Sequence, residues 1–129
     1  MAPAECETVY IVDDDESVRD SARALLESYD LAVEDFASAQ AFLEGFAAGS
    51  KARSGKVCLL LDVNMPEMGG LELLELLRDR QIDIPVIIVT AQNEADLRER
   101  AKRAGAFAFL QKPVDDSLIE TIDQALKAA

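Results

Sequence analysis

Short apolar runs alternate with helical periods along the whole chain. Three runs, at residues 8–12, 57–61 and 86–90, are almost continuously aliphatic or β-branched, which is typical of strands that are covered on both faces. Two less uniform runs, at residues 33–36 and 106–110, are candidates for strands nearer the edges of the same sheet. The pattern therefore predicts five strands, of which the first three named are central.

The segments between and after these runs carry apolar residues at helical spacing. In the first segment Val18, Ala22, Leu25 and Tyr29 repeat at that spacing, and we expect them to face the core. Further helices are predicted over residues 38–48, 71–77, 94–104 and 118–126. Ser38 is expected to be an N-cap, because its hydroxyl can accept a hydrogen bond from the first turn of a helix.

The predicted helix over residues 94–104 differs from the others in its surface. Its apolar face consists of alanines and Leu97, whereas Arg98, Arg100, Lys102 and Arg103 occupy much of the remainder. We expect this helix to pack lightly and to present a basic face in an otherwise acidic chain.

The number of strand–helix units sets the expected fold class. Five units within 129 residues favour an α/β fold with a parallel sheet, helices on both faces and right-handed crossover connections. We predict one domain over residues 1–129, with its core at about residues 8–127. Ligands of such sheets bind beyond the carboxyl ends of the strands, so candidate functional residues are sought directly after each strand.

Composition limits the class of protein. The chain has 25 acidic and 13 basic side chains, a net charge of −12, and an apolar content of half its residues. That apolar content is sufficient for a folded core, whereas the acidic balance argues against nucleic-acid binding, which depends on patches of Lys and Arg. No apolar run is long enough to span a bilayer, and the first residues do not resemble a signal peptide. We therefore expect a cytoplasmic protein that binds no membrane.

Two residue types restrict the possible chemistry. The chain contains no His, which excludes imidazole acid–base catalysis, the usual Ser–His or Cys–His pairing and His-ligated zinc. The spacing of Cys6 and Cys58 suits neither a metal site nor a disulfide framework. Carboxylates remain the main candidates, and residues 1–48 contain 12 of them beside only two basic residues, Arg19 and Arg23.

Four acidic residues, Asp13, Asp14, Asp15 and Glu16, directly follow the first predicted strand. A solvated turn that caps the next helix would explain one or two of them equally well, because carboxylates stabilise helix N-termini. Four neighbouring like charges repel one another, and a bound cation would relieve that repulsion. The run therefore favours a cation site at this strand end.

Asp62 follows the third predicted strand. A lone Asp at a strand end is more often a turn or cap residue, but this strand is predicted to lie beside the first one. Oxygen atoms from Asp13 or Asp14, from Asp62 and from a backbone carbonyl of the following loop would form the open, partly hydrated site that Mg²⁺ prefers.

The last two predicted strands lead to Thr90 and Lys112. Taken alone, each is more often a structural or solvated residue. At the same rim as the acidic residues, however, they would add a hydroxyl donor and an ammonium group. Phosphoryl transfer requires such a set, because a metal and a cation offset charge on the phosphoryl oxygens while a nucleophile is held in line. The residues indicate transfer of a phosphoryl group to an aspartate.

Together these residues make the chain resemble the receiver domain of two-component response regulators, from Thr8 to Leu126. The matching motifs are Val12-Asp13-Asp14, Asp62 with Met65-Pro66, Val89-Thr90-Ala91 and Lys112-Pro113. The resemblance implies a flavodoxin-like, doubly wound (βα)5 fold with a five-stranded parallel sheet in the order 2-1-3-4-5.

The resemblance also implies residue roles. Asp62 would be the phosphoacceptor, and Thr90 and Lys112 would contact the phosphoryl oxygens. Mg²⁺ would be bound directly by Asp14, largely through water by Asp13, and by Asp62 and the backbone carbonyl of Asn64. Asp14 and Asp15 could form the acidic pair instead, but Asp13 directly follows the apolar strand, and Arg19 lies where the family often has a basic residue after the pair. We therefore choose Asp13 and Asp14 and expect Asp15 to cap the first helix.

The function implied by the resemblance is signal transduction. A histidine kinase or a histidine phosphotransfer protein would supply the phosphoryl group, and the domain would catalyse only its own phosphorylation and dephosphorylation. Phosphorylation would draw the Thr90 hydroxyl inward, and the aromatic switch residue Phe109 would enter the space that is vacated. The helix over residues 94–104, the fifth strand and the last helix would then bind a downstream protein or a second copy of the domain.

Two other readings remain. Asp13 and Asp15 loosely resemble the Asp-x-Asp motif of haloacid-dehalogenase-like phosphatases, in which the first Asp is the nucleophile, although the chain is short for that family. The domain could also be an interaction module that works without phosphorylation, against which the full set of family residues argues.

Overall fold

The structure is a computed structural model in which residues 8–49, 56–63, 65, 67–91, 95–112 and 115–128 are described. Strands and helices alternate along it: β1 (Thr8–Val12), α1 (Glu16–Glu27), β2 (Ala32–Phe36), α2 (Ala39–Gly49), β3 (Val57–Leu61), α3 (Gly70–Asp79), β4 (Val86–Thr90), α4 (Ala95–Arg103), β5 (Ala108–Gln111) and α5 (Asp116–Ala128). The three central strands, β1, β3 and β4, have the bounds that the apolar runs predict.

All five strands are parallel and lie in one sheet, in the order β2-β1-β3-β4-β5. This order and the flavodoxin-like fold were expected and are confirmed. Val12, at the end of β1, is in register with Phe36 of β2 and with Leu61 of β3. The residues that follow β1 and β3, Asp13 and Asp62, therefore begin next to each other at the carboxyl edge of the sheet.

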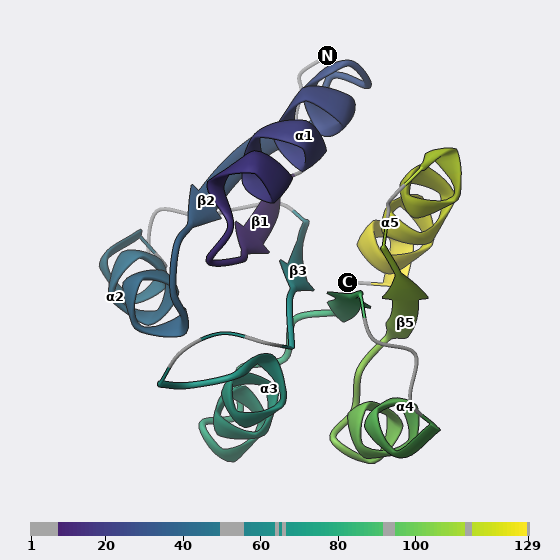
Figure 1. Ribbon diagram of the computed structural model, residues 1–129. Coiled ribbons are helices and arrows are strands. Elements are labelled where there is room, and N and C mark those ends of the chain that lie inside the picture. The colour runs from purple at the N-terminus through teal and green to yellow at the C-terminus, as the bar shows by residue number, and fades with distance from the viewer. Residues whose placement is uncertain are drawn as a thin grey trace.

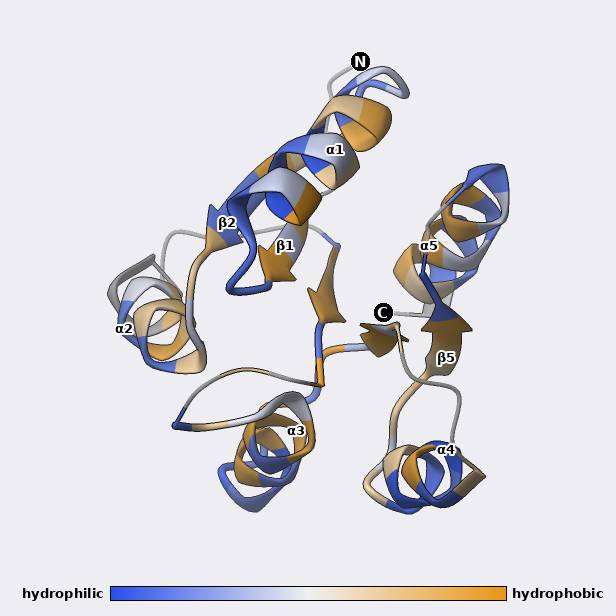
Figure 2. Ribbon diagram, viewed as in Figure 1, coloured by the Kyte–Doolittle hydropathy of each residue, from blue (hydrophilic) through white to orange (hydrophobic). Residues whose placement is uncertain are grey.

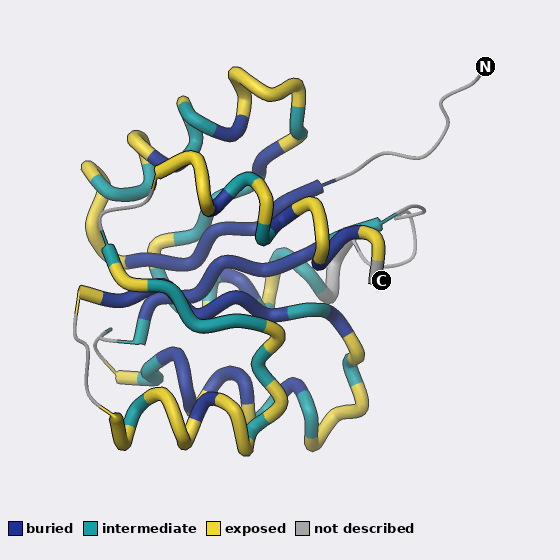
Figure 3. Tube along the Cα trace, turned by 90° about the vertical axis from the view of Figure 1, so that its right-hand side faces the viewer, coloured by how far each residue is buried: buried dark blue, intermediate teal, exposed yellow. Residues whose placement is uncertain are grey.

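The helices form two layers, one on each face of the sheet. Helices α1 and α5 lie on one side, and α2, α3 and α4 lie on the other (Figure 1). Successive strand residues point alternately into the two layers, so the apolar strands supply both cores. In Figure 2 the strands β1, β3 and β4 are largely orange, while β2 and the helices also carry blue. Figure 3 shows the same division as a buried centre with exposed outer turns.

Helix caps place the first two helices where the sequence indicated. The Asp15 side chain accepts hydrogen bonds from the backbone N–H groups of Ser17 and Val18, which makes it the N-cap of α1. The Ser38 hydroxyl accepts from the N–H of Ala41 at 3.0 Å, at the start of α2. Each cap satisfies donors that have no partner within the helix.

The predicted core face of α1 was partly wrong. Ala22 and Leu26 are the buried residues of this helix, whereas Leu25 is half-buried and Tyr29 is 47% exposed. Since α1 ends at Glu27, the helical period does not continue as far as Tyr29. The core face is therefore centred about one residue away from the predicted stripe.

The start of β5 was also predicted two residues too early. The N–H of Ala106 donates to the carbonyl of Ala101 at 2.9 Å, so Ala106 still belongs to the turn that closes α4. Gly105 precedes it with a φ of +94°, a conformation that glycine adopts without steric cost. The strand begins only at Ala108.

Helix α4 packs lightly, as its sequence predicts. Its buried residue is Ala101, Leu97 is half-buried, and Arg98 and Arg100 are exposed. Glu94, the predicted first residue of this helix, lies outside the described residues. Among the helices that are described, none is both long enough and apolar enough to cross a membrane.

Candidate functional site

Three acidic side chains from two strand ends converge at the carboxyl edge of the sheet. One carboxylate oxygen each of Asp13, Asp14 and Asp62 lies within 4.8 Å of the others. Asp13 and Asp62 are buried and Asp14 is exposed, so the group is open to solvent on one side. The backbone carbonyl of Asn64, the fourth expected ligand, lies outside the described residues.

Lys112 supplies a positive charge to the same site. Its Nζ donates to Asp13 Oδ2 at 2.8 Å and lies 3.4 Å from Asp62 Oδ1. Its backbone N–H donates to the carbonyl of Thr90 at 2.8 Å, which fixes the Lys beside the end of β4. Partial burial alone would lower the pKa of Lys112, but the hydrogen bond to Asp13 and the charges of Asp62 and Asp13 raise it overall. The side chain is therefore a stable cation.

The charges of the site do not balance within the protein. Three carboxylates face one ammonium group, which leaves an excess of two negative charges when all are ionised. Burial and then the neighbouring charge of Asp13 raise the pKa of Asp62, Lys112 opposes the rise, and the resulting pKa is about 6. Oxygen ligands, an open side and this excess charge suit a hard divalent cation. The acidic group can thus hold a metal ion.

Hydrogen bonds restrain both the backbone and the side chain of Asp13. Its Oδ1 accepts from the N–H of Asp15 at 2.9 Å, and its own N–H donates to the carbonyl of Phe36 at 3.2 Å. Its carbonyl accepts from the Arg19 guanidinium at 2.8 Å. The sequence reasoning used Arg19 only to choose the acidic pair, and it did not predict this contact with the Asp13 carbonyl.

Gly70 is a second residue that sequence reasoning missed. A Cβ at this position would overlap the carbonyl oxygen of Asp62 and would lie 3.0 Å from the Cα of Val63. The N–H of Gly70 also donates to the carbonyl of Val63 at 3.1 Å. Helix α3 therefore begins directly against the backbone that carries Asp62, and the only sequence signal was the Gly69-Gly70 pair.

Thr90 and Phe109 lie on the same face of the sheet. Thr90 is buried at the end of β4, two residues beyond Ile88, which packs in the layer of α2, α3 and α4. Phe109 of β5 is half-buried against that layer. The guanidinium of Arg98 lies over the Phe109 ring at 4.8 Å from its centroid, so a basic residue of α4 contacts the expected switch residue.

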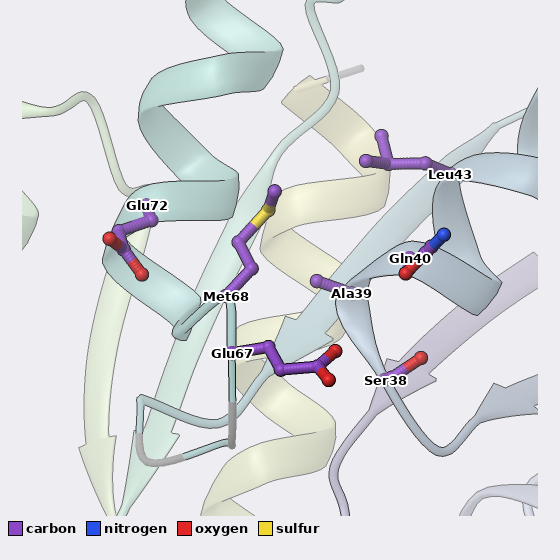
Figure 4. Close-up of a pocket in the computed structure, with 7 residues that line it drawn as sticks. All are labelled: Ser38, Ala39, Gln40, Leu43, Glu67, Met68 and Glu72. Carbon is purple, nitrogen blue, oxygen red and sulfur yellow. The ribbon is translucent and has the colours of Figure 1, made fainter.

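A larger opening lies away from these charged residues. A groove of about 400 Å³ runs between the first turns of α2 and α3 and is lined by Ser38, Ala39, Gln40, Leu43, Glu67, Met68 and Glu72 (Figure 4). The space lined by both Asp62 and Lys112 is only about 30 Å³. We assign the chemistry to the carboxyl edge of the sheet and not to the groove, because the three carboxylates and the Lys112 ammonium converge at that edge. Glu72 of the groove already accepts from the N–H of Gly69.

Comparison with known proteins identifies the family. Residues 9–123 match the model of the response regulator receiver domain. The chain belongs to this family. It is therefore a signalling domain of the two-component response regulator type, and the family match goes against the phosphatase reading.

Relatives and solved structures agree with this assignment. The chain is 41% identical over 119 residues to the transcriptional regulatory protein FixJ of Rhizobium meliloti, covering 92% of this chain and 56% of FixJ. It is 40% identical over 120 residues to the transcriptional regulatory protein TdiR of Thauera aromatica, covering 92% of this chain and 51% of TdiR. The chain thus spans about half the length of these curated relatives.

The fold is matched by experimental structures. A crystal structure of FixJ-N superposes with a TM-score of 0.84 at 37% identity and covers 98% of both chains. A structure of the response regulator StyR gives a TM-score of 0.78 at 37% identity, covering 95% of this chain and 60% of StyR.

Proposed function

We propose that Asp62 accepts a phosphoryl group from a phosphohistidine of a histidine kinase or a histidine phosphotransfer protein, with Mg²⁺ as the cofactor. The observation that carries the proposal is the position of the Lys112 ammonium between Asp13 and Asp62, at 2.8 Å and 3.4 Å. An ammonium group here can leave Asp62 for an incoming phosphoryl oxygen while it remains bound to Asp13.

The transfer step balances without a further reactant. A carboxylate oxygen of Asp62 attacks phosphorus, the P–N bond to the donor imidazole breaks, and the imidazole nitrogen keeps the electron pair and takes up a proton. The product is an acyl phosphate on Asp62, which water later hydrolyses. Lys112 and the Thr90 hydroxyl would contact the phosphoryl oxygens and stabilise their charge.

Asp13, Asp14, Asp62 and the Asn64 carbonyl are the proposed Mg²⁺ ligands. Bound Mg²⁺ would neutralise the charge that collects when a phosphoryl group approaches three carboxylates. Asp14 is exposed and can bind the ion directly, whereas both oxygens of Asp13 already accept hydrogen bonds, which favours contact through water. Asp15 is committed to the helix cap, and this supports Asp13 and Asp14 as the acidic pair.

The proposed output is a change on the surface formed by α4, β5 and α5. A phosphoryl group on Asp62 would draw the Thr90 hydroxyl toward it, and the space left behind can admit the Phe109 ring from the same face of the sheet. Helix α4 packs lightly enough to move with this change. We propose that this surface binds a downstream protein or a second copy of the domain.

FixJ and TdiR are transcriptional regulatory proteins, and by analogy we propose that this receiver controls transcription. The receiver itself contributes no nucleic-acid contact under this proposal, in keeping with its net charge of −12.

The direct test is phosphorylation by a small donor. Incubation with acetyl phosphate and Mg²⁺ should add one phosphoryl group, detected by intact mass, and EDTA should prevent the addition. Asp62→Asn should abolish it. The control is Asp15→Asn, which keeps an N-cap residue on α1 and should be phosphorylated normally.

Two results would contradict the proposal. One is an unchanged gain of a phosphoryl group by Asp62→Asn. The other is a peptide map that places the acyl phosphate on Asp13, which would revive the phosphatase reading.

The output surface can be tested by charge reversal. If phosphorylation promotes self-association through α4, sedimentation velocity should show a dimer that Arg98→Glu and Arg100→Glu weaken. Arg80→Glu, an exposed reversal at the end of α3, is the control and should leave association unchanged. If the wild type and the three variants associate equally, the surface formed by α4, β5 and α5 is not the site of association.

A further inference from the structure

Arg19 of α1 turns back toward the loop from which its helix starts. Its backbone N–H donates to the carbonyl of Asp15 at 3.0 Å, as part of the first helical turn. Its guanidinium donates to the carbonyl of Asp13 at 2.8 Å, and the side chain is only 17% exposed. A long cationic side chain is thus largely withdrawn from solvent to bind one backbone oxygen.

The guanidinium is itself held from the other side. Arg19 Nε lies 3.7 Å from Asp35 Oδ2 on β2, and Asp35 Oδ1 accepts from Arg23 at 3.2 Å. The planar guanidinium can serve both partners, because its donors point in several fixed directions. Arg19 therefore connects β2 to the loop that carries the acidic pair.

The carbonyl of Asp13 belongs to the peptide group that joins Asp13 to Asp14. A hydrogen bond to this oxygen restrains the plane of the peptide, and the plane in turn restricts where the Cβ of Asp14 points. The preceding peptide is restrained as well, because the Asp13 N–H donates to Phe36. Asp14 is exposed, and repulsion from Asp13 and Asp62 would otherwise favour turning its carboxylate toward solvent.

We propose that Arg19 is a positioning residue for the metal site, which holds the Asp13–Asp14 peptide so that Asp14 stays with Asp13 and Asp62. This inference rests on the proposed function, since it concerns the proposed Mg²⁺ site. Residues that orient metal ligands without touching the metal affect affinity by about 10- to 100-fold when they are replaced.

Simple electrostatics makes the opposite prediction. Arg19 is a positive charge near a cation site, so its removal alone should strengthen the attraction for Mg²⁺. Positioning predicts weaker binding and charge removal predicts tighter binding, and the sign of the change separates the two.

The test measures Mg²⁺ affinity directly, by isothermal titration calorimetry and by the shifts of backbone amides in an NMR titration. Arg19→Met removes both the charge and the donor and should weaken Mg²⁺ binding by about tenfold. The matched control is Arg23→Met. It removes the same charge one helical turn later and a contact with Asp35, but it leaves the hydrogen bond from Arg19 to the Asp13 carbonyl in place. It should bind Mg²⁺ as tightly as the wild type or more tightly.

A second variant keeps the charge. Arg19→Lys retains the cation but loses the planar group that serves Asp13 and Asp35 together, so we expect binding weaker than in the wild type and stronger than in Arg19→Met. If Arg19→Met does not fold, this variant decides the question, because electrostatics alone predicts no change. The ¹³C carbonyl shift of Asp13, measured without Mg²⁺, should move in both Arg19 variants and stay in place in Arg23→Met.

The outcomes separate this inference from the proposed function. A wild-type protein that does not bind Mg²⁺ overturns the proposed metal site itself. A wild-type protein that binds Mg²⁺, together with Arg19 variants that bind it as tightly as Arg23→Met, overturns only the positioning role.

Discussion

At Asp62 the fold acts against the charge that the proposed chemistry requires. The carboxyl group is buried beside Asp13, and its pKa is raised to about 6. Lys112 lowers the cost of ionisation but does not remove it. The ionised carboxylate of Asp62 is destabilised in the unliganded protein, and a bound metal ion or an attached phosphoryl group would relieve that destabilisation. The raised pKa therefore fits the proposed function.

This cost predicts a pH-dependent stability. Because the folded pKa of Asp62 lies above the ordinary 3.8, the folded protein holds the extra proton between about pH 4 and pH 6. The stabilisation from that proton is present at low pH and is lost as the pH rises through about 6. Asp62→Asn does not titrate. The wild type loses stability over this range and the variant does not. The free energy of unfolding of Asp62→Asn minus that of the wild type should therefore rise by about 1–2 kcal/mol between pH 4.5 and pH 7.5.

Urea denaturation of both proteins in EDTA, at these two pH values, measures the difference. EDTA is needed because a bound divalent cation would stabilise the ionised carboxylate. A difference between the two proteins that does not change with pH would show that Asp62 ionises normally.

At the scale of the elements, the beginning of α3 determines the position of Asp62. The helix starts at Gly70 in direct contact with the backbone of Asp62 and Val63. Side chains of α3, among them Leu71, Leu74 and Leu77, are buried under the sheet, so the helix cannot move away without losing core contacts. The absence of a Cβ at residue 70 is therefore a requirement of packing.

Gly70→Ala should destabilise the domain by about 2–3 kcal/mol, because the three atoms nearest to the added methyl group all belong to the backbone. It should also slow phosphorylation by displacing Asp62. The comparison is Gly45→Ala within α2, where the new Cβ would lie 2.7 Å from the Phe36 ring, a side chain that can shift. We expect a smaller loss there, because alanine also favours the helix by about 1 kcal/mol. Equal losses in urea denaturation would contradict the close approach at Gly70.

At the scale of the whole molecule, the net charge of −12 has two separate consequences. Self-repulsion among surface carboxylates is general and is screened by any salt. The excess negative charge at Asp13, Asp14 and Asp62 is local and calls for a divalent cation. The two effects can be separated by comparing Mg²⁺ with a monovalent salt.

MgCl₂ at about ten times its dissociation constant should stabilise the protein by about 1.4 kcal/mol more than NaCl of equal ionic strength. For a domain of this size the difference corresponds to a rise of about 5 °C in Tm. Asp14→Asn, at an exposed position, should keep the response to NaCl and lose the additional response to Mg²⁺. Differential scanning fluorimetry measures both, and an equal response of wild type and variant to the two salts would exclude a specific site.

Local patterns in the sequence were sufficient for most of the fold. The bounds of β1, β3 and β4, the caps Asp15 and Ser38 and the light packing of α4 could all be predicted from the types of residue within a few positions of one another. The core face of α1 and the start of β5 did not, because the point at which a helix ends depends on the elements that pack against it.

By itself, the sequence determined which chemical groups are present and that they follow the ends of strands. Resemblance added the strand order, which brings Asp13 and Asp62 to neighbouring positions. Only the tertiary structure decided that Lys112 lies between two carboxylates 99 and 50 residues away, that Arg19 binds the carbonyl of Asp13, and that Gly70 contacts Asp62. Periodicity indicates which face of a helix or strand a residue lies on. These contacts depend instead on how elements far apart in the sequence pack against one another, and no local pattern of residues encodes that packing.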